Sequence, residues 1–407
     1  MSVIKVAILG FGTVGEGVYK TIQSHRDELS AVLGKKVEVA AVLVRNKHKY
    51  RNIAEGVLVT TDFNDILQLP ELDVVVEAIV DREPTFTMLK RAIQRDCHII
   101  TANKEMFAHH GEELLELAEN HHVSVGFEAT VAGGIPIIQT LRQLLKINRV
   151  SEIQGILNGT SNFILTEMRE KKQSFKEALV LAQAKGYAEA DPTNDIEGLD
   201  AFYKTMILSR IAFGEELQKH NVELKGITAI SSEQIVAAGN LGLRFKHVAV
   251  IKKTGTKVTA TVIPVLVGPS HPFYHVEGVE NAVNVQSDIV GSITLQGPGA
   301  GMFPTASAVI EDLVYVCQNH SRNRVIINDP IQPVSFTEEI REYWFIQGLN
   351  REYKNTNINW MERIDHETYI VEAAKEEVLK LKVDNQAVHA YPILGDYVKV
   401  HKGLQMI

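Results

Sequence analysis

Apolar residues gather into short runs over residues 1–131, and stretches with helical spacing separate these runs. The first run, Val3–Leu9, is followed by a helical pattern over Val14–Ile22. Strands that are apolar at nearly every position are typical of a parallel sheet covered by helices on both faces. Later runs of this kind are Lys36–Val44, Asp73–Ala78, His98–Ala102 and Ser124–Glu128, and further helical patterns are Glu83–Arg95 and Gly111–Asn120. The alternation predicts an α/β domain over residues 1–131 with a doubly wound parallel sheet.

The pattern changes at Val131–Pro136, a stretch with two adjacent glycines that we interpret as a domain junction. We expect an α+β domain with an open mixed sheet over residues 132–299, and we expect residues 300–330 to return to the first domain with a helix at Thr305–Cys317. The other expected helices are Ile137–Lys146, Ser161–Lys171 and Phe175–Lys185, and the expected strands are His247–Lys253, Lys257–Leu266 and Ser292–Gln296. A separate alternation predicts a small α+β domain over residues 336–407. Its expected elements are Glu342–Gly348, Asn357–Arg363, Thr368–Ala373, Lys375–Leu381 and His389–Leu394.

The composition is ordinary for a folded chain of 407 residues, with 45% hydrophobic and 23% charged residues. The net charge of −8 and the lack of a long Lys/Arg block argue against nucleic acid and anionic membranes as partners. Cys97 and Cys317 lie far apart in the sequence, which suits a reducing compartment and provides no disulfide framework. With no signal-peptide pattern and no apolar stretch of membrane-spanning length, we expect a cytoplasmic protein.

The first apolar run ends in Gly10-Phe11-Gly12-Thr13-Val14-Gly15, directly before the first helical pattern. A strand, a G-x-G-x-x-G turn and a helix form a dinucleotide-binding fingerprint. The glycines let the backbone approach a pyrophosphate, and the helix N-terminus offers free N–H groups to that anion. The alternative is a glycine-rich turn without a ligand. The fingerprint predicts a Rossmann domain whose cofactor contacts all six residues of this turn.

The residue after the second predicted strand is Arg45, and Lys47, His48, Lys49 and Arg51 follow. Sites that prefer NAD usually carry Asp or Glu there for the ribose 2′-OH. A cationic group at this place fits the 2′-phosphate of NADP, so we predict NADP as the preferred cofactor, with NAD as a possibility. The alternative is a solvated basic loop.

Acidic residues are densest between Gly186 and Lys204. Asp200 and Lys204 are four residues apart and share one face if this segment is helical. Such a pair beside a hydride acceptor could transfer protons. The alternative is that Asp195 caps the helix and that Asp200 and Lys204 form an ordinary surface pair. Lys104 follows a predicted strand of the parallel sheet, at the edge where such sheets bind ligands, so it is placed to meet a substrate carboxylate or carbonyl. The alternative is a solvated lysine.

Six motifs follow one another over roughly residues 1–330. They are G-F-G-T-V-G at Gly10–Gly15, T-A-N-K at Thr101–Lys104, G-G-I-P at Gly133–Pro136, G-I-L-N-G-T-S-N-F-I-L at Gly155–Leu165, the acidic segment Gly186–Lys204, and G-P-G-A-G with T-A-S-A-V at Gly297–Gly301 and Thr305–Val309. In these motifs and in their order the chain resembles the homoserine dehydrogenase family.

The resemblance implies NAD(P)-dependent interconversion of L-homoserine and L-aspartate 4-semialdehyde in threonine, methionine and isoleucine biosynthesis. Lys204 matches the general acid/base, and Lys104 matches a lysine that contacts substrate and cofactor. The residues that match substrate-binding positions are Glu189, Asp200, Asp195, Thr160, Gly159 and Tyr187. Gly186 and Gly301 match positions near the cofactor.

The resemblance also implies a monovalent cation, most simply sodium, held by Glu128 and by the carbonyls of Val131, Gly133 and Ile135. It further implies a homodimer or homotetramer.

The chain departs from the family's pattern at two places. Val80-Asp81 occupies a place where the family often has Gly-Gly. The C-terminal segment is similar to an ACT regulatory domain only in truncated form, which leaves threonine inhibition and a role in assembly both open.

Two other functions are alternatives to homoserine dehydrogenase. Aspartate-semialdehyde dehydrogenase would need a cysteine nucleophile. A non-catalytic nucleotide-sensing protein could use the same fold.

Overall fold

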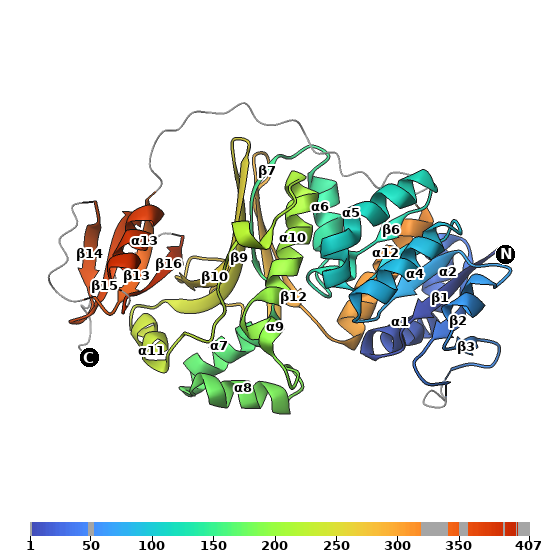
Figure 1. The fold of residues 1–407 in the computed structure, drawn as a ribbon, viewed down its shortest axis with the longest axis horizontal. Helices are drawn as coiled ribbons and strands as arrows, with labels where there is room; N and C mark the ends of the chain where they lie inside the picture. Colours follow the sequence, from blue (N-terminus) through green and yellow to red (C-terminus); the bar gives the residue numbers. More distant parts are fainter. Residues whose placement is uncertain are drawn as a thin grey trace. The chain divides into compact units, whose positions relative to one another are not determined.

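The computed structural model describes residues 2–47, 53–318, 341–349, 357–385, 387–395 and 397. The chain divides into two compact units. Unit 1 comprises residues 1–153, 200–218 and 281–329, and unit 2 comprises residues 154–199, 219–280 and 330–407. No helix within the described residues is long and apolar enough to cross a membrane. Figure 1 labels the elements used below.

Unit 1 contains a parallel sheet whose strands lie in the order β3-β2-β1-β4-β5-β6. All five neighbouring strand pairs are parallel. The order runs outward from β1 in both directions, so right-handed crossovers place helices on both faces. This confirms the predicted doubly wound sheet. The strands are β1 Val3–Leu9, β2 Lys36–Leu43, β3 Leu58–Thr60, β4 Val74–Glu77, β5 His98–Thr101 and β6 Val125–Gly126.

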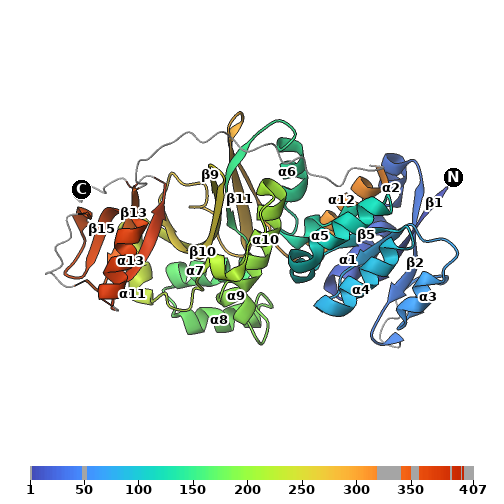
Figure 2. The same ribbon diagram turned by 45° about the horizontal axis from the view of Figure 1, so that its top comes forward.

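Helix α12 (Met302–Gln318) packs with α1 (Thr13–Ser24) against this sheet although it lies far away in the sequence. In Figure 1 the orange α12 lies among the blue elements of the N-terminal sheet, and Figure 2 gives the turned view. Gly17 allows the close approach, because a Cβ there would lie 2.8 Å from the Met302 carbonyl oxygen. Val309, Leu313 and Val316 join the core formed by β1, β2 and α1. The other helices of the sheet are α2 Arg26–Leu33, α3 Phe63–Leu67, α4 Arg82–Ile93 and α5 Lys104–Asn120.

The remainder of unit 1 combines helices with three neighbouring strands in the order β12-β11-β7. The helices are α6 Ile137–Leu144 and α10 Leu199–Phe213, and a 3₁₀ turn spans Glu128–Thr130. The strands are β7 Val150–Ile156, β11 Glu280–Ser287 and β12 Gly291–Pro298.

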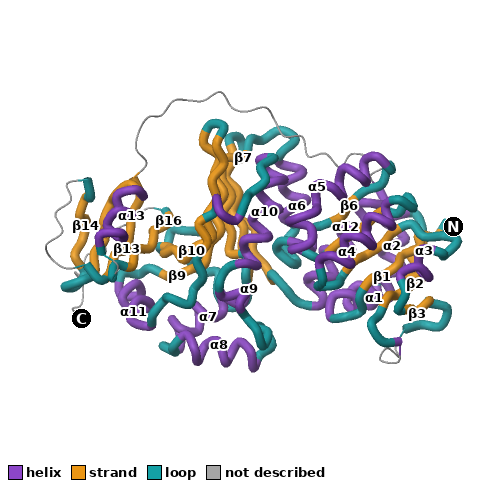
Figure 3. The backbone as a smooth tube through the Cα atoms, viewed as in Figure 1, coloured by secondary structure: helices purple, strands orange, loops and turns teal. Residues whose placement is uncertain are grey.

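Unit 2 is built on the antiparallel pair β9 and β10, and Figure 3 shows its strands in orange and its helices in purple. Strands β8 and β16 both pair with β10 in parallel, which confirms a mixed sheet. The strands here are β8 Glu223–Leu224, β9 Arg244–Thr254 and β10 Lys257–Val267. The helices are α7 Gly159–Lys171, α8 Phe175–Ala184, α9 Thr193–Ile196 and α11 Ser232–Asn240.

The described part of the C-terminal segment adds four strands and one helix to unit 2. The strands are β13 Arg341–Gln347, β14 Asn359–Arg363, β15 Thr368–Ala374 and β16 His389–Leu394, and the helix is α13 Lys375–Asp384. They lie in the order β16-β13-β15-β14 with antiparallel pairing. Through β16 this segment continues the sheet of β10.

The structure departs from the expected elements at several places. It adds β7, β11, α11 and the small elements around β3, which we did not predict. Helix α5 begins at Lys104 rather than Gly111, because the Asn103 side chain accepts a hydrogen bond from Met106 N and caps it. Strand β6 ends at Gly126, since Glu128 already begins the 3₁₀ turn.

The packing of α12 yields a test of the core. Leu313 is fully buried, whereas Phe303 on the same helix is 60% exposed. We expect Leu313→Ala to lower the free energy of unfolding by about 2–5 kcal/mol, through lost apolar contact and a cavity. Phe303→Ala should change it by less than about 0.5 kcal/mol. Urea unfolding of the full chain measures both, and equal effects would contradict the assigned packing.

Candidate active site

The turn Gly10–Gly15 has the geometry that a bound pyrophosphate requires. Gly10 adopts φ +91°, a conformation that disfavours other residues. A Cβ on Gly15 would lie 2.0 Å from the Gly10 carbonyl oxygen, so helix α1 can begin here only with glycine. A Cβ on Gly12 would meet no atom within 4 Å, which leaves its outer side open to a ligand. The free N-terminus of α1 follows directly.

A cavity of about 710 Å³ opens beside this turn within unit 1. This volume lies within the range of roughly 300–1,000 Å³ that is typical of small-molecule sites. It is lined by Gly10, Phe11 and Gly12, and by residues at the carboxyl ends of β2 and β4. Arg45 lies on its rim, where its guanidinium is 2.8 Å from the Asp81 carboxylate. Both side chains are largely exposed. His48, Lys49 and Arg51 of the basic segment lie outside the described residues.

Lys104 is held at the carboxyl edge of the parallel sheet by a chain of hydrogen bonds. The Thr101 hydroxyl donates to the buried Glu77 carboxylate at 2.5 Å. Asn103 N donates to the Thr101 hydroxyl, and the Asn103 side chain donates to Ile79 O. These bonds join the ends of β4 and β5 to the first residue of α5, which is Lys104. The lysine stem is thereby anchored while its side chain stays 44% exposed.

Asp200 is the centre of the candidate active site because its carboxylate contacts two lysines. Its Oδ2 accepts a hydrogen bond from Lys204 Nζ at 2.8 Å, along one face of α10. Its Oδ1 forms an ion pair with Lys104 Nζ. The side chains of Asp200 and Lys204 are only 4% and 9% exposed. The interpretation of Asp200 and Lys204 as an ordinary surface pair is therefore wrong, since a buried charge is retained only with partners.

Unit 2 brings several other predicted residues together. The Thr160 hydroxyl donates to Tyr187 O at 2.5 Å. The Asn158 side chain donates to Asp195 Oδ1 at 2.7 Å and also caps α7, which begins at Gly159. Gly186 adopts φ +74°, and Glu189 is exposed two residues after Tyr187. Thr160, Tyr187 and Asp195 thus belong to one polar group at the start of α7.

Glu128 lies in a buried acidic pair within unit 1. Its carboxylate accepts hydrogen bonds from Ile138 N at 2.7 Å and Gln139 N at 2.8 Å, at the first turn of α6. Its backbone N–H donates to Asp312 Oδ2 at 2.7 Å. Burial raises the pKa of Glu128 to about 7. Burial and the nearby Glu128 charge raise the pKa of Asp312 well above its usual range. Positive charge here would favour the ionised carboxyls.

The backbone beside Glu128 is tightly packed. Gly133 adopts φ +58°, and a Cβ there would lie 2.4 Å from the Gly299 carbonyl. Val131 and Ile135 flank it and are buried. No group of three or more His, Cys, Asp or Glu side chains suited to a metal occurs in the part of the chain that the structure describes. A cation at Glu128 would therefore depend on backbone carbonyls as its other ligands.

Neither cysteine has the surroundings of a nucleophile. Cys97 is fully buried, and burial raises the pKa of its thiol to about 11. Burial raises the pKa of Cys317 to about 11 as well. A catalytic cysteine needs an accessible thiolate, so the aspartate-semialdehyde dehydrogenase alternative loses its chemical basis.

Sequence reasoning missed Glu77, Asn103 and Asp312. Glu77 ends the otherwise apolar strand β4, and a lone acid in that position was an available signal. Burial raises its pKa to about 7, although hydrogen bonds from Thr101 and Ile79 N lower it. Asp312 gave no signal, because it follows a glutamate in a helix and only the fold shows its burial.

The Rossmann sheet, the open glycine turn and the buried lysine–carboxylate pair together define a dinucleotide-binding enzyme. The family profile for the homoserine dehydrogenase NAD-binding domain matches residues 10–128, and the homoserine dehydrogenase profile matches residues 136–314. The homoserine dehydrogenase of Bacillus subtilis is 42% identical over 320 residues, which cover 78% of this chain and 74% of that protein.

Solved structures agree with the sequence matches. A homoserine dehydrogenase from Thiobacillus denitrificans has a TM-score of 0.86 at 34% identity, covering 98% of this chain and 99% of that one. A hyperthermophilic archaeal homoserine dehydrogenase in complex with NADPH has a TM-score of 0.68 at 27% identity, covering 79% of this chain and 100% of that one. The chain belongs to the homoserine dehydrogenase family, and it is an NAD(P)-binding oxidoreductase that interconverts L-homoserine and L-aspartate 4-semialdehyde.

Proposed function

We propose that Lys204 is the general acid/base of this reaction and that Lys104 is a second catalytic lysine. The observation that carries the proposal is the Asp200 carboxylate, which contacts both ammonium groups. Lys204 is buried and oriented by this contact, as a positioned proton donor requires. Lys104 is nearly half exposed, so it remains accessible to a substrate oxygen.

The reaction needs one proton transfer beside the hydride transfer. When bound, the nicotinamide dinucleotide supplies or accepts the hydride. Lys204 Nζ gives its proton to the aldehyde oxygen of aspartate semialdehyde as the alcohol forms, and in the other direction it takes the proton of the homoserine hydroxyl. Asp200 positions the Lys204 nitrogen in both directions of the reaction, because its Oδ2 lies 2.8 Å from Lys204 Nζ.

Homoserine carries both an ammonium and a carboxylate group, so its site needs charges of both signs. We assign Glu189, Asp200 and Asp195 to the ammonium end. Thr160, Gly159 and Tyr187 shape the pocket, and their support is the hydrogen bond between Thr160 and Tyr187 O at the start of α7. In cells the reaction would serve threonine, methionine and isoleucine biosynthesis.

NADP is the proposed preferred cofactor, held by Gly10–Gly15, Lys104, Gly186 and Gly301, with Arg45 on the 2′-phosphate. Its support is the position of Arg45 on the rim of the cavity beside the glycine turn. The NADPH complex of the archaeal relative is consistent with this preference. Asp81 competes for the same guanidinium, because the two side chains form an ion pair.

A sodium ion at Glu128 and a homodimer or homotetramer complete the proposal. Buried carboxyls at Glu128 and Asp312 support a cation, with the Val131, Gly133 and Ile135 carbonyls as its other ligands.

Assembly is supported by β12, the terminal strand of its sheet, and by the exposed apolar side chains of Ile289 and Val290 next to it. Light scattering after gel filtration measures the assembly.

The role of Lys204 is tested by Lys204→Met, which keeps the length of the side chain. We expect kcat for homoserine oxidation to fall by about 10²–10⁴-fold, the usual contribution of a general acid/base. Lys146→Met, at an exposed lysine, is the control and should leave kcat unchanged. Stopped-flow or steady-state rates give the answer once circular dichroism shows that both variants fold. Retained turnover in Lys204→Met would remove this residue from the role.

The cofactor preference is tested at Arg45 and Asp81 in opposite directions. Arg45→Ala should raise KM for NADP by about 3- to 10-fold with little change for NAD, since only NADP has the 2′-phosphate. Asp81→Asn should lower KM for NADP, because it releases the guanidinium. Steady-state kinetics with both cofactors measure this. An equal change for NADP and NAD in Arg45→Ala would show that Arg45 does not distinguish them.

The cation is tested by unfolding temperature in sodium chloride and in choline chloride at equal ionic strength. The raised pKa of Glu128, about 7, means that its contribution to stability is present below pH 4.5 and is lost as pH rises through 7. A bound cation would offset this loss of stability only at a pH at which the Glu128 carboxyl is ionised. We therefore expect sodium to raise the unfolding temperature at pH 8 and not at pH 4.

Glu128→Gln is the matched control, because it keeps the size of the side chain and removes the charge, although only one of the two N–H donors to Glu128 keeps an acceptor. In this variant the difference between sodium and choline should disappear at pH 8. A sodium effect that persists in Glu128→Gln would contradict the assignment.

A further inference from the structure

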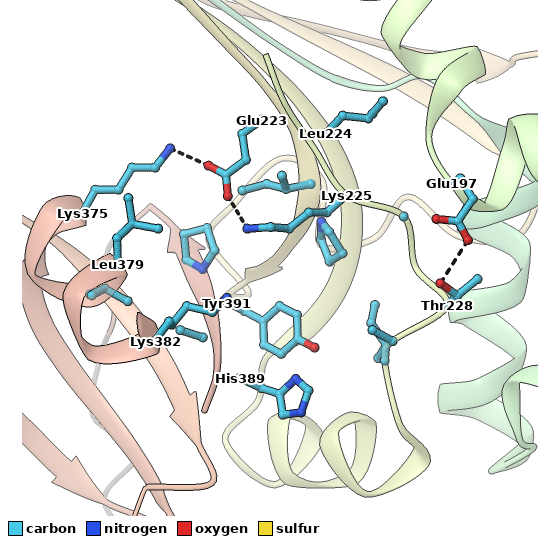
Figure 4. A pocket seen from close by; sticks show the side chains of 18 of the residues that line it. Glu197, Glu223, Leu224, Lys225, Thr228, Lys375, Leu379, Lys382, His389 and Tyr391 are labelled. Atoms are coloured by element: carbon cyan, nitrogen blue, oxygen red, sulfur yellow. Dashed lines mark hydrogen bonds and ion pairs between the residues drawn. The ribbon is translucent and has the colours of Figure 1, made fainter. Parts of the chain in front are cut away.

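A second cavity, of about 620 Å³, lies entirely within unit 2, and none of the residues proposed for the reaction lines it. Figure 4 shows that α13 contributes Lys375, Leu379 and Lys382 to one side of it. Strand β8 and the residues after it form another side, and β16 contributes His389 and Tyr391. Apolar surface makes up much of the lining, from Leu224, Ile263, Pro264, Trp344, Leu379 and Pro392.

Two of the cavity's lysines already pair with one glutamate. Lys375 Nζ lies 2.7 Å from Glu223 Oε2, and Lys225 Nζ pairs with the other oxygen of the same carboxylate. Although burial raises the pKa of Glu223, the hydrogen bonds from Lys225 and Lys375 outweigh it and hold that pKa below its usual value. Across the cavity the Thr228 hydroxyl donates to Glu197 at 3.1 Å. Figure 4 draws these contacts as dashed lines.

Lys382 lines the cavity outside this network of ion pairs, and so does Lys219. The Lys382 side chain is partly buried. Within the described residues it forms no ion pair or hydrogen bond. Burial and the charge of Lys225 lower its pKa, so its surroundings disfavour the bare ammonium group. An anion placed beside Lys382 would remove this penalty.

The lining as a whole is positive although the chain carries a net charge of −8. Four lysines, Lys219, Lys225, Lys375 and Lys382, face two glutamates, Glu197 and Glu223. A concave apolar surface with a few convergent polar groups is the usual form of a small-molecule site. An inorganic anion would leave the apolar surface unused, whereas an organic anion would cover it.

We propose that this cavity binds a small organic carboxylate, with its apolar body against Leu379 and Pro392 and its carboxylate beside Lys382. The site is separate from the proposed reaction chemistry. Leu199 lines it and is also the first residue of α10, the helix that carries Asp200 and Lys204. An occupant would therefore touch the segment that leads into the catalytic helix.

The probe is 4-fluorobenzoate, followed by ¹⁹F NMR titration of the full chain. We expect saturable binding at or below roughly 10 mM, and about 10-fold weaker binding in Lys382→Gln. Lys382→Arg should restore it by keeping the charge. Lys380→Gln is the matched control on the same helix, since Lys380 pairs with Glu377 and does not line the cavity. It should bind like the unchanged chain.

Competition distinguishes an organic carboxylate from other ligands. Benzoate should displace the probe, and neither 4-fluorobenzyl alcohol nor inorganic phosphate should do so at the same concentration. Displacement by phosphate as effective as by benzoate, equal binding in Lys382→Gln, or no saturable binding would each overturn the proposal. Dehydrogenase activity should be unchanged in Lys382→Gln, so this result and that of Lys204→Met can be judged separately.

Discussion

The contact of one carboxylate with two lysines is the constraint on which the candidate site depends. Asp200 and Lys204 lie on α10, whereas Lys104 begins α5 almost 100 residues earlier in the chain. A buried lysine is costly without a partner, and Asp200 supplies that partner to both lysines. The fold of unit 1 brings α5 and α10 together at Asp200. The Asn103 side chain caps α5 and so fixes the position of Lys104. The four-residue spacing along α10 places Lys204 beside Asp200.

Buried carboxyls join neighbouring elements at two places in unit 1. Glu77 joins the ends of β4 and β5 through Thr101, and Glu128 joins the 3₁₀ turn to the first turn of α6. Both accept N–H or O–H donors that would otherwise lack partners, which explains why acids occupy apolar surroundings. Their raised pKa values of about 7 are the consequence. Such groups make the unit's stability sensitive to pH.

The sequence was sufficient for the class of the parallel sheet and for five of its six described strands, since only β3 was not predicted. Strand β1 matches its predicted bounds, because both faces of the strand are buried and its residues are almost all apolar. Strand β11 was missed since it carries Asn281 and Asn284, which are polar in sequence and buried in the fold. Helix α11 was missed although Ser231 and Gln234 form a capping box that was visible in the sequence.

The sequence indicated which residues belong to the candidate site, but it did not indicate that their side chains are buried. Six motifs in order indicated Lys104, Asp200 and Lys204, yet spacing alone favoured an ordinary surface pair for Asp200 and Lys204. Burial decides between these readings, and burial depends on contacts between distant segments. The same limit applies to the second cavity, whose lysines come from α13 and from the residues before and after β8 and carry no motif.

A crystal structure of the chain with dinucleotide and homoserine bound is the most direct test. We expect the homoserine hydroxyl oxygen to lie about 2.6–3.2 Å from Lys204 Nζ, with Asp200 still in contact with that lysine. A hydroxyl held by another side chain, with Lys204 Nζ directed into bulk solvent, would contradict the account.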